Sequence, residues 1–300
     1  MKKVFFIALC ILILTAAVFA QLTLPRESQR QEIAQTVGDT KISIVYHRPN
    51  VKARKIWGCQ TNDFLPKGGV TYPCLVPYGQ VWRTGANENT TFEVTNDVIV
   101  NGKKLPAGKY GLHTVPNPND WTIIFSKVND AWGSFTYDQK NDALRVSAKP
   151  QTGAFQETMS INFDGVLPTA TQVVIAWENV RVPFTVDAGD VSARTLTQIR
   201  EAIKNRKADD TRPLNQGAGY VLSLKLKDNY AEALGWLDES LKTRETFGTL
   251  NTKARLSAEA GQKQDAIATA EKAIQVGKAA TPAADTSDLE KLLAKWKSGM

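Results

Sequence analysis

Histidine is nearly absent from this sequence, and its absence limits the chemistry that the protein can perform. Only His47 and His113 are present among 300 residues. No serine stands in a Gly-x-Ser-x-Gly turn and no glycine-rich loop opens a predicted helix, so the motifs of serine hydrolases and phosphate-binding loops are missing. A metal site through His47, His113 and Glu88 would require three distant segments to converge. We therefore expect no metal and no cofactor.

The sequence has only one long hydrophobic run, and this run lies near residue 1. Lys2 and Lys3 precede an apolar stretch over residues 4–18, which the small residue Ala20 follows. The pattern is typical of a secretory signal peptide, and the run is shorter than the roughly 20 residues of a spanning helix. We predict a signal peptide over residues 1–20, with a retained anchor as the alternative, and hence a periplasmic or secreted protein. No later segment is long or apolar enough to span a membrane.

Charge of one sign is not concentrated anywhere in the chain. Lysine and arginine number 37 against 30 acidic residues, and loss of the two signal-peptide lysines leaves 35 against 30. The surplus is spread evenly along the chain, whereas nucleic-acid-binding proteins usually gather it on one face or stripe. We therefore expect no nucleic-acid partner.

Cysteine is also scarce, and two of the three cysteines are predicted to form a disulfide. Cys10 lies in the signal peptide, so the exported chain keeps Cys59 and Cys74, on either side of a loop rich in glycine and proline. One pair of cysteines in an exported protein most simply forms a disulfide. Closing a loop this short should stabilise the fold by roughly 3 kcal/mol on the chain-entropy estimate.

Residues 21–187 carry the period-two pattern of β-strands. Ile42, Ile44 and Tyr46, for example, share one face of a strand. Short strands at regular spacing, with turns between them, favour an all-β domain built as an antiparallel sandwich or barrel. We expect a hairpin that joins residues 97–100 to residues 109–113. The predicted strands lie at residues 32–37, 41–46, 91–95, 97–100, 109–113, 121–126, 133–137, 143–148, 158–163, 172–178 and 180–186.

Residues 188–300 are rich in alanine, leucine, lysine and glutamate, with apolar residues spaced by three and four. The sequence around Ala233 repeats around Ala266, at a spacing near the roughly 34 residues of a tetratricopeptide unit. We predict a tetratricopeptide-like α-helical domain, and hence an α+β chain, in which these helices either pack as a structural appendage or form a groove for a protein partner. The predicted helices lie at residues 195–206, 213–226, 230–243, 249–260, 264–277 and 285–297.

The segment from Val76 to Val94 holds the candidate site. Pro77, Gly79 and Gly85 break the backbone, so a loop presents polar and aromatic side chains just before a strand begins. Flat rings beside guanidinium, amide and carboxylate groups suit a sugar, a peptide or a small acid. The candidate binding residues are Tyr78, Trp82, Arg83, Thr84, Asn87, Glu88 and His113.

Two functions are open for this site. Non-catalytic binding of a ligand or a protein is the leading interpretation, and we assign no catalytic residue. The alternative is a hydrolase in which Arg83, Glu88 and His113 supply an oxyanion donor, an acid and a base. Arg83 and Glu88 could equally form a salt bridge that only holds the loop. Trp121 and Trp177 align with aliphatic neighbours and are expected in the core.

Several collinear segments carry a family resemblance, namely residues 46–52, 75–93, 101–116, 121–125, 176–179 and 182–184. Together these segments resemble the bacterial family called domain of unknown function 2911. The resemblance implies an exported protein of no established activity, with a β domain followed by a tetratricopeptide-like helical end. It carries over no catalytic residue. Cys59 and Cys74 lie in an insertion relative to the family pattern.

Overall fold

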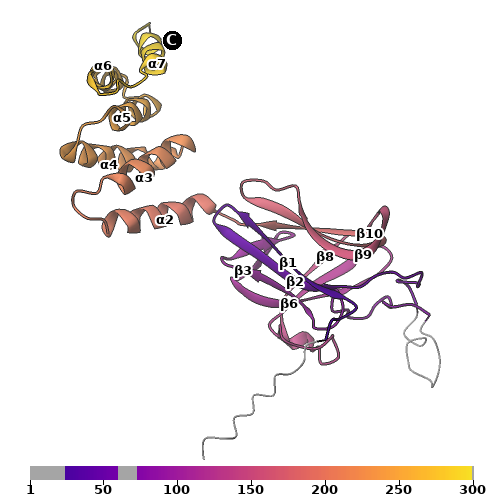
Figure 1. Ribbon diagram of the computed structural model, residues 1–300. Coiled ribbons are helices and arrows are strands. Elements are labelled where there is room, and N and C mark those ends of the chain that lie inside the picture. The colour runs from indigo at the N-terminus through magenta and orange to yellow at the C-terminus, as the bar shows by residue number, and fades with distance from the viewer. Residues whose placement is uncertain (1–23, 60–72, 299–300) are drawn as a thin grey trace, which may run out of the picture. The chain divides into compact units, whose positions relative to one another are not determined.

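The computed structural model describes residues 24–59 and 73–298, and the chain divides into two units, Met1–Gly189 and Asp190–Met300. Figure 1 shows strands in the first unit and helices in the second. The predicted signal peptide at residues 1–20 lies outside the described residues. Within the described ranges, no helix has the length and apolar character needed to cross a membrane.

The first unit contains two antiparallel sheets in the described part of the chain. One sheet has the strand order β1-β2-β3-β6-β7-β8, and the other has the order β5-β4-β10-β9. This arrangement, followed by helices, confirms the predicted α+β class. The strands are β1 (Gln29–Val37), β2 (Thr40–Arg48), β3 (Thr90–Val94), β4 (Val98–Val100), β5 (Lys103–Leu105), β6 (Gly108–Val115), β7 (Trp121–Ser126), β8 (Asp142–Ala148), β9 (Gln151–Asp164) and β10 (Ala170–Asp187).

Aromatic side chains join the two sheets in a sandwich core. The rings of Phe92 on β3 and Phe125 on β7 have centroids 5.0 Å apart, and Phe125 also contacts Phe184 of the opposite sheet at 6.1 Å. All three rings are fully buried. The hydroxyl of Tyr46 on β2 accepts a hydrogen bond from the Ile161 N–H of β9 at 2.8 Å. The alternation of apolar and polar residues therefore places one face of each sheet in a shared core.

Three expectations about strands are wrong. Residues 172–178 and 180–186 belong to one strand, β10, because register shifts and a positive φ of 52° at Glu178 accommodate the irregularity without ending the pairing. Residues 133–137 form turns, not a strand. Residues 97–100 and 109–113 form no hairpin, since β4 pairs with β5 and β10 whereas β6 pairs with β3 and β7.

The second unit is a succession of helices, each packed on the next along the chain. Leu214, Ala218, Trp236 and Leu237 belong to one apolar cluster, and a second cluster contains alanines that allow close helix approach. Gly217 lies where helices meet, because a Cβ there would be 2.6 Å from a side-chain carbon of α2. The helices are α2 (Val191–Lys204), α3 (Arg212–Ser223), α4 (Tyr230–Thr243), α5 (Phe247–Glu259), α6 (Lys263–Ala279) and α7 (Ser287–Ser298).

Candidate functional site

The candidate loop lies between β2 and β3 and is attached to β6. The main chain of Trp82 exchanges two hydrogen bonds with Thr114 of β6, at 2.7 and 2.9 Å. Beyond Trp82 the chain turns through Thr84 and Asn87, whose φ angles are 55° and 59°. The hydroxyl of Thr90 donates to the Thr84 carbonyl at 2.7 Å, and the Thr84 hydroxyl bonds that of Thr114 at 3.2 Å. The predicted site residue Thr84 is therefore buried in the turn and stabilises it.

Four tryptophans, one of them Trp82 of this loop, form one aromatic cluster. Trp82 stacks on Trp177 of β10 with ring centroids 5.9 Å apart, and it contacts Trp57 edge-on at 5.5 Å. Trp121 of β7 also packs against Trp57, at 5.1 Å. Trp121 and Trp177 are each 2% exposed, as expected of core residues, whereas Trp82 is only half-buried. The Trp82 indole N–H donates to the Gly85 carbonyl at 3.1 Å, which fixes the ring's orientation.

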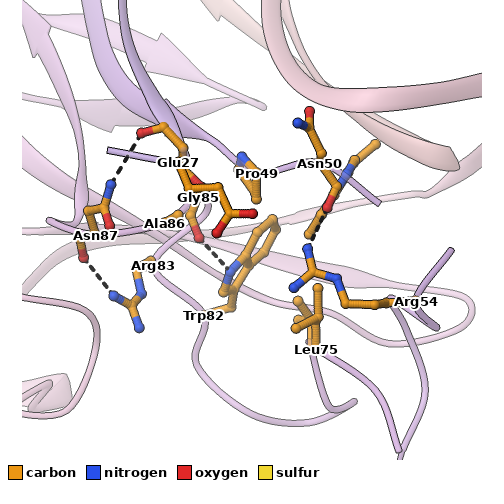
Figure 2. A pocket seen from close by; sticks show the side chains of 13 residues that line it. Glu27, Pro49, Asn50, Arg54, Leu75, Trp82, Arg83, Gly85, Ala86 and Asn87 are labelled. Atoms are coloured by element: carbon orange, nitrogen blue, oxygen red, sulfur yellow. Dashed lines mark hydrogen bonds between the residues drawn. The ribbon is translucent and has the colours of Figure 1, made fainter. Parts of the chain in front are cut away.

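Trp82 and Trp177 line a cavity of about 260 Å³. Figure 2 shows Arg83 and Arg54 on either side of Trp82, with the side chain of Glu27 beside the ring. The Arg54 guanidinium donates to the Asn50 carbonyl at 2.6 Å, and Asn87 donates to the Ser28 carbonyl at 3.3 Å. The lining residues are Glu27, Ser28, Pro49, Asn50, Arg54, Leu75, Val76, Trp82, Arg83, Gly85, Ala86, Asn87 and Trp177.

Arg83 has an environment unusual for an arginine. Its Nη1 donates to the Asn87 carbonyl at 2.6 Å, and its Cζ lies 5.4 Å from the centroid of the Phe135 ring. Within residues 24–59 and 73–298, no carboxylate forms an ion pair with Arg83. Burial of the guanidinium lowers the pKa of Arg83. Arg83 also lines a second cavity of about 230 Å³, together with Phe135 and Ser134. The guanidinium therefore keeps donor capacity beside two cavities.

Glu88 lies apart from Arg83 and has a different partner. Its carboxylate accepts hydrogen bonds from Arg26 Nη1 at 2.7 and 2.5 Å, and His47 Nδ1 lies 3.6 Å from it. The hydrogen bond from Arg26 is the largest factor that lowers the pKa of Glu88. Glu88 lines a separate cavity of about 660 Å³. The alternative in which Arg83 and Glu88 form a salt bridge does not match these contacts.

His113 lies on β6, beneath the turns that follow β7. It is 3% exposed, its Nδ1 lies 2.8 Å from the Ser134 hydroxyl, and its ring is 5.5 Å from that of Tyr137. Burial lowers the pKa of His113 to about 4, so the ring is neutral at pH 7. Tyr78 packs over Gly58, where an added Cβ would lie 2.8 Å from the tyrosine ring. Neither His113 nor Tyr78 lines the cavity at Trp82.

The predicted disulfide is present beside the cavity wall. Cys59 and Cys74 are bonded, with their Cα atoms 5.5 Å apart, and they close the loop whose residues 60–72 lie outside the described ranges. Next to the disulfide, the Val76 N–H donates a hydrogen bond to the Ile56 carbonyl at 2.8 Å, and Trp57 and Val76 form an isolated β-bridge. The disulfide therefore links the two short segments that hold Trp57 and Val76 at the site.

The sequence interpretation missed several residues that line the cavities. Glu27, Asn50, Arg54 and Trp177 come from segments far from the loop, and Phe135 lies in a segment expected to be a strand. The sequence holds no local signal that these residues converge, because their convergence depends on how strands pair within each sheet and on how the two sheets pack.

Comparison with known proteins adds one match. A family model described as "Protein of unknown function (DUF2911)" matches residues 28–186, which is more than half of the chain and spans β1 to β10 except for the last residue of β10. Searches of curated proteins and of solved structures return no significant match. The family match confirms the resemblance inferred from the sequence.

Proposed function

The chain belongs to the DUF2911 family of proteins of unknown function, and on that premise we propose that its β unit binds a small ligand without catalysing a reaction. The ligand would carry a carboxylate group next to a flat or apolar part, as a sugar acid, an aromatic acid or a peptide C-terminus does. It would occupy the cavity at Trp82 and place its carboxylate on Arg83.

The observation that carries this proposal is that Arg83 has no carboxylate partner among the described residues. A guanidinium has five N–H donors, and the described contacts of Arg83 use one Nη for the Asn87 carbonyl. Partial burial of a cation costs free energy unless an anion or further acceptors compensate. A carboxylate can accept two parallel hydrogen bonds from a guanidinium, which is the pairing that Arg83 lacks within the described ranges.

The aromatic side chains support a ligand with a flat or apolar part. Trp82 offers a half-buried indole held by its bond to Gly85, and Phe135 is 79% exposed beside Arg83. The two cavities that Arg83 lines, of about 260 and 230 Å³, are small, so the ligand would be a small molecule or a chain terminus.

The hydrolase alternative is less well supported. Its proposed acid, Glu88, forms a salt bridge with Arg26, and its proposed base, His113, forms a hydrogen bond with the Ser134 hydroxyl. Ser134 lines a cavity together with Arg83, so a nucleophile and a histidine do lie side by side. However, a histidine with a pKa of about 4 is a weak base at neutral pH, where catalytic bases work best with a pKa near the working pH. Covalent labelling of Ser134 by a fluorophosphonate would indicate a reactive serine and would support the hydrolase alternative.

The proposal is tested by thermal unfolding of the protein in the presence of small carboxylates, sugars and peptides. A ligand at about 100 times its dissociation constant stabilises the folded state by roughly 2.7 kcal/mol, a shift of several degrees for a chain of this size. We expect carboxylates to shift the wild type and not Arg83→Ala. Arg48→Ala is the matched control, since Arg48 bonds the Met159 carbonyl at 2.8 Å and does not line the cavity. Equal shifts in the wild type and Arg83→Ala would refute the proposal.

Export and a role for the helical unit complete the proposal. The predicted signal peptide supports a periplasmic or secreted location, and the Cys59–Cys74 bond suits an oxidising compartment. The tetratricopeptide-like helical unit would act either as a structural appendage or as a groove for a protein partner. Cell fractionation with and without residues 1–20 tests export, and retention of the protein inside the cell in both cases would contradict it.

A further inference from the structure

We propose that Glu88 and Trp132 form a second binding site, specific for a guanidinium group, and that Arg26 of the same chain occupies this site in the described structure. The proposal does not depend on the carboxylate site at Arg83. It concerns the separate cavity of about 660 Å³ that Glu88 lines.

The contacts of Arg26 are those that proteins use to recognise guanidinium groups. Its Nη1 donates to both oxygens of Glu88, at 2.7 and 2.5 Å, and its Cζ lies 5.5 Å from the centroid of the Trp132 ring. A carboxylate combined with an aromatic face matches the planar, delocalised charge of arginine better than the compact charge of lysine. Glu88 and Trp132 therefore form the two halves of one receptor.

The receptor residues are held by the main chain, independently of Arg26. Glu88 and Trp132 are partners in an isolated antiparallel bridge. On the two sides of this bridge, the Asn89 N–H donates to the Ala131 carbonyl at 3.0 Å and the Gly133 N–H donates to the Asn87 carbonyl at 3.2 Å. Removal of the Arg26 side chain would leave these bonds in place. Trp132 is 54% exposed, so its ring is open to a ligand.

The occupant, in contrast, sits on a weakly attached segment. Residues 24–28, which precede β1, contain no buried residue, and the side chains of Arg26 and Glu88 are 45% and 43% exposed. The other contacts of this segment include a hydrogen bond of 3.3 Å from Asn87 to the Ser28 carbonyl and an exposed pair between Glu27 and Lys52, and exposed ion pairs of this kind contribute little to stability. An external guanidinium can thus compete with Arg26. The adjoining cavity gives room for the rest of such a ligand.

A purely structural role for Arg26 makes a different prediction. If Arg26 only holds the segment before β1, its removal lowers stability and changes no binding. If Arg26 is an intramolecular occupant, its removal opens the site, because a tethered group competes at an effective concentration in the millimolar range. Binding that is gained on removal of a side chain is the result that separates the two roles.

The experiment compares wild type, Arg26→Ala and the double variant Arg26→Ala/Glu88→Gln, and measures binding from the indole N–H signal of Trp132 in NMR titrations. The probes are N-acetylarginine amide, its uncharged analogue N-acetylcitrulline amide, and a pentapeptide with a central arginine. We expect Arg26→Ala to bind the arginine probe about tenfold more tightly than wild type does. The citrulline analogue should not bind, and the double variant should lose the arginine probe.

Comparison of the amide with the pentapeptide shows whether free arginine derivatives or peptides are the better ligands. A folded Arg26→Ala variant that binds the arginine probe no better than wild type would overturn the proposal, and so would equal binding of the citrulline analogue. If Arg26→Ala does not fold, Arg26→Gln replaces it under the same criteria. The probe is a cation and the signal is that of Trp132, so a failed carboxylate site at Arg83 cannot be mistaken for failure here.

Discussion

Replacement of the buried His113 by glutamine should change how the stability of the protein depends on pH. The imidazole is 3% exposed, and burial lowers its pKa to about 4, whereas a histidine in an unfolded chain has a pKa of about 6.5. Above pH 6.5 the ring is neutral in both states, so its titration has no effect. Between pH 6.5 and 4 the unfolded state binds a proton that the folded state does not bind, so stability is lost as pH falls.

The magnitude follows from the difference between the two pKa values. A difference of about 2.5 units, at 1.36 kcal/mol each, corresponds to about 3 kcal/mol lost by the wild type between pH 6.5 and 4. At pH 7.5 we expect His113→Gln to be less stable than wild type by about 1 kcal/mol, because the hydrogen bond to Ser134 is changed. Glutamine does not titrate, so the stability advantage of wild type over His113→Gln should shrink and then reverse as pH falls.

Urea unfolding at several pH values between 7.5 and 4.5, followed by tryptophan fluorescence, measures this difference in stability. Carboxylates titrate alike in both proteins, so the difference between them isolates His113. His47→Gln provides a comparison, since the neighbouring carboxylate of Glu88 opposes the effect of burial on the pKa of His47. A gap between wild type and His113→Gln that does not vary with pH would refute the reasoning.

Three further predictions concern packing, a buried hydrogen bond and the disulfide. Gly217→Ala should lower the free energy of unfolding by about 1–3 kcal/mol through overpacking, whereas Gly219→Ala, with open space in the same helix, should raise it by up to about 1 kcal/mol; equal effects in thermal melts would contradict this. Tyr46→Phe should cost about 1–3 kcal/mol in urea unfolding because it leaves a main-chain N–H of β9 without its acceptor, and unchanged stability would refute that bond. Cys59→Ser/Cys74→Ser should cost roughly 3 kcal/mol, with reduced wild type behaving alike, and a variant as stable as the oxidised protein would contradict the estimate.

Regular elements followed from the sequence where one periodicity dominated. The predicted strand at residues 121–126 coincides with β7, and the predicted helix at residues 230–243 coincides with α4. In both, apolar residues repeat at the period of the element and turn residues flank the segment. The prediction of a strand at residues 133–137 was wrong because the residues alternate as in a strand, whereas Gly133 adopts a φ of 71° and the chain turns above His113.

The site was only partly predictable, for a physical reason. The loop around Trp82 and Arg83 stood out because prolines and glycines break the backbone beside aromatic and charged residues. The residues that contact this loop could not be predicted, because packing of the two sheets brings Trp177 to Trp82, and a turn after β7 brings Phe135 to Arg83. Whether Glu88 pairs with Arg83 or Arg26 depends on which cation the fold brings within reach, and no sequence spacing encodes that choice.

The most direct test of the proposed function is a calorimetric titration of the carboxylate that gives the largest thermal shift. Hydrogen bonds to a charged group contribute about 1.5–3 kcal/mol each, so Arg83→Ala should weaken binding by roughly tenfold to more than a hundredfold relative to wild type. Arg83→Lys should recover only part of the loss, because lysine cannot form the paired hydrogen bonds of a guanidinium. A dissociation constant that is the same for wild type and Arg83→Ala would contradict a ligand site at Arg83.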